Sequence, residues 1–332
     1  MYIPKKRSFG ALLLAVTLTL GLAACGTNKE EAAKGTTGNV TKKEQPPASH
    51  TYTDALGRKV EIPSEPKRIV AHFYAPEMVS LNTGMVGTNF ANARLVLEEE
   101  QLKGVEDIGG QGSAPSLEKV LALAPDLIIV PDFLDAAPLE GLSKIAPTVT
   151  MPYSGDVFSR ITALGDIIGK QDEAAAWIKR YKDKSEQKRK ELAPLVEKGQ
   201  TASAFVVFQD KQLYIYGPQR LGPTMYDALG FKPPEALKRL FAEKENEDKM
   251  WLTISLEKLP ELAGDHIFLV TQDANEASRK GVEELIQNSV WKSLPAVQNG
   301  QAYVVSNRWA FNDSVTLEWL LDEMPKVLKP QS

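Results

Sequence analysis

Two segments of this chain repeat one pattern: Ser116-Leu-Glu-Lys-Val-Leu-Ala-Leu-Ala-Pro-Asp-Leu-Ile-Ile-Val130 and, 139 positions later, Ser255-Leu-Glu-Lys-Leu-Pro-Glu-Leu-Ala-Gly-Asp-His-Ile-Phe-Leu269. Eight of the fifteen aligned positions are identical and no gap is needed. Because solenoid repeats recur about every 20 to 50 residues, this longer spacing indicates two similarly built lobes. In each lobe we expect a helix from Ser-Leu-Glu-Lys onward, a short loop and a buried strand. Two matching lobes predict a cleft between them, where a ligand would bind.

The first 24 residues are typical of an export signal. Three basic residues at 5–7 precede an apolar stretch at 11–22, which is shorter than the roughly 20 residues of a membrane-spanning helix. Leu22-Ala-Ala-Cys25 resembles a bacterial lipobox, in which cleavage before the cysteine lets its thiol receive a diacylglyceryl group. The alternative is a plain secretory signal with a chance cysteine. Residues 25–50 are poor in large apolar side chains and are predicted to be a disordered tether. We therefore expect a protein anchored through Cys25 to the extracytoplasmic face of the cell membrane.

The composition excludes one class of partner. The formal net charge is −4 and the sequence shows no basic stripe, so nucleic-acid binding is not expected. Cys25 is the single cysteine, so disulfides should not contribute to stability. Around 280 residues must then be held by core packing, which suits two lobes of ordinary domain size.

Strand and helix signals alternate along the remaining chain, which predicts an α/β fold. We expect two Rossmann-like lobes, at 51–160 and 200–330, joined by a linking helical segment at 161–199. Residues 174–192 contain no Gly or Pro, and Ala175, Ile178 and Tyr181 form an apolar stripe, which predicts one long amphipathic helix. A helical linker should let the cleft open and close by small angles only. A hairpin is predicted at 52–62, and the other strands at 68–74, 127–130, 148–153, 204–208, 213–216, 266–270 and 302–305.

Further motifs carry a resemblance to a known family. They are Asp54-Ala-Leu-Gly-Arg-Lys-Val60, Pro66-Lys-Arg-Ile-Val70, Ile108-Gly-Gly110, Tyr226-Asp-Ala-Leu-Gly230 and the segment 309–313 before a C-terminal helix. With the paired Leu-Glu-Lys modules, the chain resembles the lipoprotein substrate-binding proteins of ABC importers for iron–siderophore complexes, haem and cobalamin. The resemblance covers nearly the whole mature chain. It implies two lobes bridged by a rigid helix with the ligand between them, and as partners the membrane permease subunits with their cytoplasmic ATPase. We expect the protein to be monomeric.

The resemblance also implies a role for the glutamates of the two modules. Glu118 and Glu257 look like the pair that forms salt bridges with arginines on the two permease subunits. Two carboxylates at equivalent places on two lobes would match a pseudo-symmetric partner, and such charges mainly set register and association rate. The alternative is that each glutamate only stabilises the helix dipole near a helix N-terminus.

Candidate ligand-binding residues of the second lobe lie where predicted strands end. Tyr216 ends such a strand and Arg220 follows it in a Gly- and Pro-containing loop. The resemblance implies an arginine near this loop that meets the anionic oxygens of an iron chelate, and the planar fork of a guanidinium suits that role. The alternative is a solvated surface arginine. Trp251, Trp309 and Phe311 could form aromatic walls for a bulky chelate, although each is as often a core residue.

In the first lobe, Tyr74 and Phe133 are the better candidates, and Gln111 precedes the first module. His72 could ligate iron, but we expect a buried, hydrogen-bonded histidine instead. Arg308, beside Trp309, is a second possible cation for the ligand.

The ligand class follows from a departure from the family pattern. Catecholate-binding members surround a triply anionic chelate with several basic residues from both lobes. Here residues 111–113 and 132–133 offer no cation, which favours a ferric hydroxamate. A haem or cobalamin receptor of the same transporter family is the alternative.

Two other classes of protein are less compatible with the sequence. An enzyme would need a nucleophile–base pair, but there is no Gly-x-Ser-x-Gly elbow, P-loop or zinc motif, and only three histidines. A bare metal-ion-binding protein would need a cluster of His, Asp and Glu in the cleft, and none is evident. We therefore expect no catalytic residue, no metal site and no cofactor, with an Fe(III)-siderophore as the ligand.

Overall fold

The computed structural model describes residues 48–110, 112–247 and 249–328. The predicted export signal, Cys25, nearly all of the predicted tether and Gln111 lie outside the described residues. A hairpin comes first, as predicted, but its first strand β1 (Ser49–Thr53) begins inside the range expected for the tether. It pairs antiparallel with β2 (Lys59–Pro63). His50 therefore lies in a strand and not in the tether, because its backbone pairs with Ile62.

The first lobe is built on a five-stranded parallel sheet in the order β5-β4-β3-β6-β7. Strand β6, which lies between β3 and β7, is buried along its whole length, as its continuous apolar run predicts. The order reverses beside β3 and β6, which is the arrangement of a doubly wound sheet. The strands are β3 (Ile69–Ala71), β4 (Gly87–Thr88), β5 (Glu106–Asp107), β6 (Leu127–Pro131) and β7 (Thr148–Met151). The helices of this lobe are α1 (Ala75–Ser80), α2 (Phe90–Ala93), η1 (Glu99–Leu102), α3 (Leu117–Ala122), α4 (Ala136–Ser143) and α5 (Val157–Ile168).

The second lobe has a mixed sheet in the order β10-β9-β8-β11-β12. Strands β8, β11 and β12 are parallel, whereas β9 and β10 run antiparallel to their neighbours. The strands are β8 (Ala202–Val207), β9 (Leu213–Tyr216), β10 (Trp251–Thr253), β11 (His266–Thr271) and β12 (Ala302–Ser306). The helical segments are α7 (Ala193–Val196), η2 (Pro223–Ala228), α8 (Glu235–Ala242), η3 (Leu256–Lys258), α9 (Leu259–Leu262), α10 (Glu276–Gln287), α11 (Ser289–Ser293), α12 (Pro295–Gln298), η4 (Asn307–Ala310) and α13 (Ser314–Leu328).

Each predicted strand is present, whereas β4, β5 and β10 were not predicted. These three strands have only two or three residues, which is too short for an alternating pattern to be recognised. Within the described ranges, no helix combines the length and the apolar character needed to cross a bilayer.

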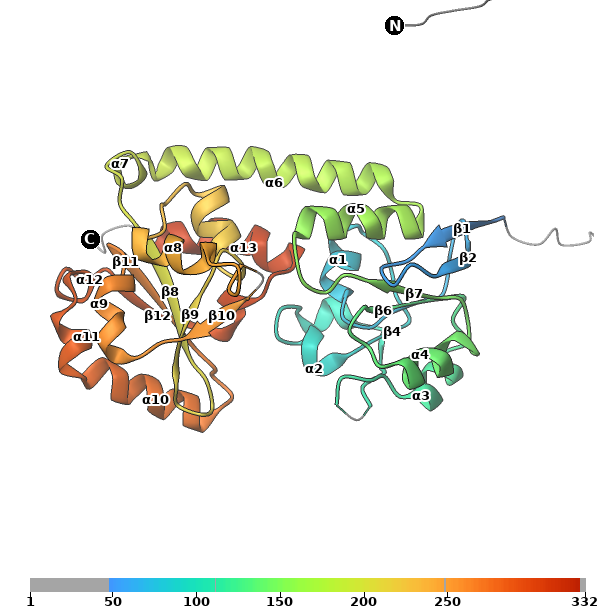
Figure 1. Ribbon diagram of the computed structural model, residues 1–332. Helices are drawn as coiled ribbons and strands as arrows, with labels where there is room; N and C mark the ends of the chain where they lie inside the picture. The colour runs from blue at the N-terminus through green and yellow to red at the C-terminus, as the bar shows by residue number, and fades with distance from the viewer. Residues whose placement is uncertain (1–47, 111, 248, 329–332) are drawn as a thin grey trace, which may run out of the picture. The chain divides into compact units, whose positions relative to one another are not determined.

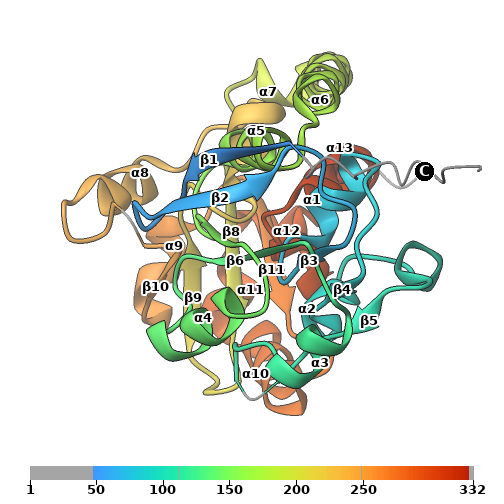
Figure 2. The same ribbon diagram turned by 90° about the vertical axis from the view of Figure 1, so that its right-hand side faces the viewer.

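The long linking helix is present as α6 (Gln171–Glu191), and Figure 1 shows it running along both lobes. In Figure 2, α6 is seen nearly end-on at the top, with α5 and the β1–β2 hairpin below it. The predicted apolar stripe was wrong in its register, because Ala175 is exposed and Ile178 only half-buried. The buried residues are instead Ala174, Trp177, Tyr181 and Ser185. The helix is rotated so that Trp177, with the largest apolar surface, packs inside.

Both ends of α6 are held by specific contacts. Near its start, Ala174 lies against Gly165 of α5, where any Cβ would meet the Ala174 Cβ at 2.9 Å. Further along, Trp177 Nε1 donates to Glu318 of α13 at 3.2 Å, and Ser185 Oγ donates to the carbonyl of Ala228 at 3.0 Å. The linker is therefore packed against elements of both lobes and is not a free rod.

Candidate functional site

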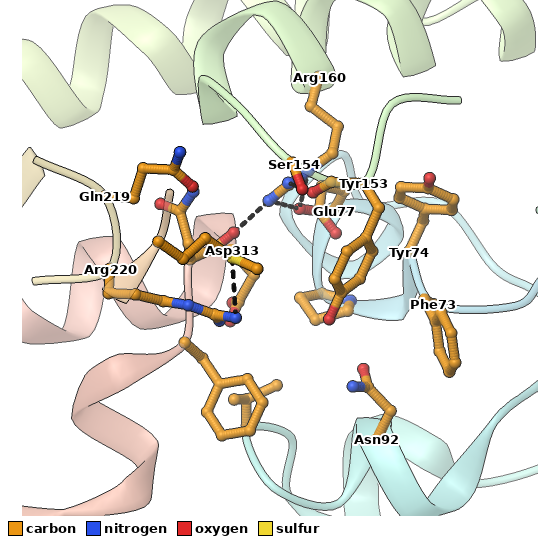
Figure 3. A pocket seen from close by; sticks show the side chains of 15 residues that line it. Phe73, Tyr74, Glu77, Asn92, Tyr153, Ser154, Arg160, Gln219, Arg220 and Asp313 are labelled. Atoms are coloured by element: carbon orange, nitrogen blue, oxygen red, sulfur yellow. Dashed lines mark hydrogen bonds and ion pairs between the residues drawn. The ribbon is translucent and has the colours of Figure 1, made fainter. Parts of the chain in front are cut away.

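A pocket opens between the two lobes beside α1, α5 and the start of α13 (Figure 3). Aromatic rings from the first lobe face an arginine and a phenylalanine from the second. Its lining residues from the first lobe include Phe73, Tyr74, Glu77, Asn92, Tyr153 and Arg160, and those from the second include Gln219, Arg220, Met250, Phe311, Asn312 and Asp313.

The first-lobe wall is placed by the carboxyl ends of parallel strands, as expected for an open α/β sheet. Phe73 and Tyr74 follow β3, and Tyr153 follows β7. Phe133 follows β6 and is 49% exposed, and its ring meets the Tyr153 ring edge-on at 5.2 Å between centroids. Phe73 lies 5.7 Å from the same Tyr153 ring. The three rings form one aromatic surface, of which Phe73 and Tyr153 line the pocket and Phe133 does not.

Tyr74 also lines the pocket but is otherwise committed to the fold. Its hydroxyl donates to the carbonyl of Met151 at 2.7 Å, and only 1% of its surface is exposed. Burial raises the pKa of this phenol well above its usual value. Tyr74 therefore has almost no surface left for a ligand, and its hydroxyl is occupied.

Arg220 reaches the pocket from the second lobe through an unusual backbone conformation. Its φ is +61°, in the left-handed region that non-glycine residues rarely adopt. Such strain persists where the surrounding structure imposes it and often marks functional positions. Its guanidinium has weak partners: Nη1 donates to the carbonyl of Ala310 at 3.3 Å, and Nη2 lies 3.2 Å from the sulfur of Met250. Nε has no hydrogen-bond partner among the described residues. A ligand with strong acceptor atoms would therefore improve its hydrogen bonding.

Two further predicted residues lie beside Arg220. Trp251 is half-buried, and the guanidinium carbon of Arg220 lies 5.6 Å from its ring centroid. Tyr216 pairs with Trp251 in the β9–β10 ladder and is buried, which raises its pKa to about 12. Neither residue lines the pocket directly. Arg220 follows β9, an antiparallel strand, so the carboxyl-end rule that selected this loop does not explain its position.

Trp309 and Arg308 lie apart from the pocket lining. Trp309 is buried and packs on Phe268 at 5.7 Å and on Trp319 at 5.8 Å between ring centroids. The guanidinium of Arg308 stacks over Trp319 at 4.4 Å and lies 3.6 Å from the carboxylate of Glu98. The neighbouring Phe311 does line the pocket.

A buried charged cluster at the base of the pocket was not foreseen from the sequence. Arg160 forms an ion pair with Glu77 at 2.8 Å, and the two side chains are 6% and 1% exposed. Asp313 lies close to both, and burial raises the pKa of Glu77 and of Asp313. Counting Arg220, the pocket lining carries two arginines and two carboxyl groups. No short stretch of the sequence indicates this cluster, because its residues are distant in the chain and only the fold brings them together.

His72 behaves only partly as expected. It is fully buried, and burial lowers its pKa to about 4. The expected hydrogen bond was wrong, since neither ring nitrogen finds a partner in the described part of the chain, and the ring stacks on Phe73 at 4.0 Å. No group of three or more His, Cys, Asp or Glu side chains suited to a metal ion occurs among the residues described.

The module glutamates lie on the surface. Glu118 is the second residue of α3 and Glu257 the second of η3, and both are exposed. Beside each glutamate lies an exposed leucine, Leu117 at 40% and Leu256 at 37%. The two modules thus present the same Leu-Glu pair to the outside.

Known proteins share this architecture. The periplasmic binding protein family matches residues 81–308 of the chain. The iron(3+)-hydroxamate-binding protein YxeB of Bacillus subtilis is 30% identical over 297 residues, which cover 88% of this chain and 85% of YxeB. The iron(3+)-hydroxamate-binding protein FhuD of the same organism is 31% identical over 322 residues, covering 95% and 96%. FhuD2 of Staphylococcus aureus with bound ferrioxamine B has a TM-score of 0.66 at 29% identity, covering 79% of this chain and 98% of that one. The chain therefore belongs to the periplasmic binding protein family.

Proposed function

We propose that this protein is the extracytoplasmic substrate-binding component of an ABC importer that captures a ferric siderophore of the hydroxamate type. The observation that carries this proposal is the pocket between the lobes, with aromatic rings on one side and the weakly partnered Arg220 on the other. A chelate with an apolar periphery and anionic oxygens around iron matches both walls. The protein would bind and release its ligand unchanged and would not be an enzyme.

The charge of the pocket favours a hydroxamate over a catecholate. Of the two arginines in the pocket lining, Arg160 is already paired with Glu77, which leaves Arg220 to face the ligand. A triply anionic chelate would be transferred from water into a site with one available cation, which is costly. A ferric trihydroxamate core is neutral and avoids that cost. The printed names of YxeB and FhuD, both iron(3+)-hydroxamate-binding proteins, support the same ligand class.

We further propose that Cys25 carries a lipid anchor after removal of residues 1–24, with 25–50 as a tether and the lobes at 51–160 and 200–330. In support, the last strand of the first sheet ends at Met151, and the first strand of the second sheet begins at Ala202. The lipobox-like Leu22-Ala-Ala-Cys25 supports the anchor. Mass spectrometry of the mature protein from its native membrane would detect the acylated Cys25.

Glu118 and Glu257 are proposed to dock the two permease subunits. They occupy equivalent positions of the two modules and are exposed, as a two-point contact with a pseudo-symmetric partner requires. Their separation from the pocket lining divides docking from ligand binding.

The test is a binding panel with matched arginine variants. The purified protein is titrated with a ferric hydroxamate, a ferric catecholate, ferric citrate, haem and cobalamin, and tryptophan quenching is recorded. We expect the ferric hydroxamate to bind tightest and Arg220→Ala to weaken it about 10- to 100-fold, since it loses charge-assisted hydrogen bonds. Arg308→Ala is the control, because that arginine is held by Trp319 and Glu98 outside the pocket lining. Tightest binding of haem or cobalamin would favour the alternative receptor function, and binding of bare Zn²⁺ or Mn²⁺ alone would refute a chelate receptor.

A further inference from the structure

Arg160 lies at the base of the pocket, where segments of both lobes meet (Figure 3). Its guanidinium makes contacts in three directions. Nε donates to Oε1 of Glu77 at 2.8 Å, Nη1 donates to the carbonyl of Tyr153 at 2.8 Å, and Nη2 donates to the carbonyl of Asn312. Because the donors of a guanidinium lie in one plane at fixed angles, the three acceptors are held in a fixed relation.

The two carbonyls belong to opposite walls of the pocket. Tyr153 lies in the first lobe between β7 and α5, and its ring is part of the aromatic surface. Asn312 lies in the second lobe directly after Phe311, whose side chain lines the other wall. Asn312 Nδ2 donates back to the carbonyl of Gly155 at 3.0 Å, so the two segments are joined a second time. Arg160 thus connects the backbones that carry Tyr153 and Phe311.

Stability alone gives little reason for an arginine at this place. A buried ion pair is often no more stable than apolar residues of similar volume, because two charges must be desolvated. The Glu77 carboxylate is also incompletely satisfied, since its Oε2 has no partner among the described residues. An apolar residue in place of Arg160 could not donate the two hydrogen bonds to the carbonyls of Tyr153 and Asn312, which belong to different lobes. Glu77 keeps the guanidinium in the orientation that makes them.

We propose that Arg160 is a positioning residue that sets the separation of the Tyr153 and Phe311 walls and thereby the size of the chelate that the pocket accepts. The inference rests on the proposed function, because size selection requires a chelate as the ligand. Arg160 acts through the two backbone segments, and Glu77 acts by orienting Arg160.

The first experiment compares Arg160→Lys with Arg58→Lys. A lysine keeps the charge but has a single compact donor head, which cannot span three acceptors in a plane. Arg58 is a matched control: it donates to Asp54 at 2.9 Å and to the carbonyl of Thr148 at 3.0 Å, in the first lobe and outside the pocket lining. Both variants and the wild type are titrated with ferrichrome and with ferrioxamine B, a cyclic and a linear ferric trihydroxamate.

The expected result is a change of selectivity in one variant only. Arg160→Lys should weaken the binding of at least one chelate about tenfold. It should also shift the ratio of the two dissociation constants by about threefold or more. Arg58→Lys should leave that ratio within about twofold of the wild type, even if its melting temperature falls. A wild-type ratio in Arg160→Lys would overturn the inference.

A second measurement does not depend on the ligand. Amide hydrogen exchange of the ligand-free proteins should be faster in both segments 152–156 and 310–313 in Arg160→Lys, and in neither segment in Arg58→Lys. Unchanged exchange in either segment would refute the coupling. If Arg160→Lys fails to fold, Asn312→Ala removes only the bond to Gly155 and should accelerate exchange in the same two segments to a smaller extent. If the wild type binds neither chelate, the proposed function and the size selection fail, while exchange still decides whether Arg160 couples the walls.

Discussion

The two repeated modules share their sequence but not their backbone. In the first lobe Ser116 caps a regular helix, α3, whereas Ser255 makes no capping hydrogen bond and is followed by the short η3 and the single turn α9. Pro260 stands where the first module has Leu121, and it lacks the N–H needed to continue a helix begun at Leu256. The second module was predicted to be one continuous helix. Pro260 is the physical reason that this helix is broken.

The shared residues divide into aspartates that link strands and an outer group, the Leu-Glu pairs. Asp126 accepts the backbone N–H groups of Lys67 and Arg68 at 2.7 and 2.9 Å, directly before β3. Asp265 accepts the N–H of Thr201 at 2.7 Å, directly before β8. Each aspartate therefore ties the strand of its module to the neighbouring strand. The Leu-Glu pairs, by contrast, point outward in both modules despite the different helices, which is why they are the part assigned to a partner.

The largest effect is expected from a buried leucine of the second module, at a position where the first module has Val120. Leu259→Ala should lower the free energy of unfolding by about 2–5 kcal/mol, because Leu259 is fully buried and leaves a cavity. Urea denaturation followed by circular dichroism measures this loss. The matched change Leu256→Ala, three residues earlier and exposed, should cost less than about 0.5 kcal/mol. Equal losses would show that the broken helix is packed differently from the structure.

Acid should lower the free energy of unfolding, because the first lobe contains the buried His72. Burial lowers the pKa of His72 to about 4, whereas His266, whose pKa is also lowered, has Gln200 and Tyr303 beside its ring nitrogens. Between pH 6.5 and 4 the unfolded chain binds a proton that folded His72 does not, so stability falls as the pH falls, by roughly 3 kcal/mol. His72→Phe should flatten this dependence in urea titrations at several pH values. His50→Phe, which changes an exposed histidine, is the control. If His72→Phe left the dependence of stability on pH unchanged, His72 would not be its cause.

The paired aspartates should give similar, smaller losses. Asp126→Ala and Asp265→Ala each remove an acceptor of exposed backbone N–H groups, which should cost about 0.5–1.5 kcal/mol in thermal or urea unfolding, because water can replace the carboxylate. Asp135→Ala is a suitable control, since this exposed residue precedes α4 without a capping hydrogen bond. A loss in only one lobe would mean that the two modules are not structurally equivalent.

The outer group should leave stability and ligand binding untouched. Glu118→Ala and Glu257→Ala should each change the unfolding free energy by less than about 0.5 kcal/mol and leave the chelate dissociation constant unchanged. Delivery to the permease should nevertheless slow, most in the double variant, because charges at a rim mainly set association rate. Uptake of ⁵⁵Fe-labelled chelate by cells measures this. Weaker chelate binding in either variant would contradict the division between docking and ligand sites.

The predictions from local patterns were the ones that the structure confirmed. The continuous apolar run of β6, the alternation of strands and helices and the helix α6 all follow from short-range periodicity. Prediction failed where two signals competed: Ala175 and Trp177 both fit helical spacings, and packing against α5 and α13 decided which face was buried. The antiparallel pairing of β9 with β8, by contrast, has a local signal, because residues 208–212 form a connection too short for a parallel crossover.

The sequence by itself determined the two-lobed α/β plan, the linking helix and the loop that carries Arg220, because each is encoded by residues close together in the chain. Only the tertiary structure decided which side chains meet at the pocket. Glu77 of α1, Arg160 of α5 and Asp313, directly before α13, are separated by 83 and 153 positions, and their pairing depends on how α1, α5 and α13 pack. Such long-range contacts leave no periodicity in a single sequence, since burial and charge compensation arise only when the lobes are assembled.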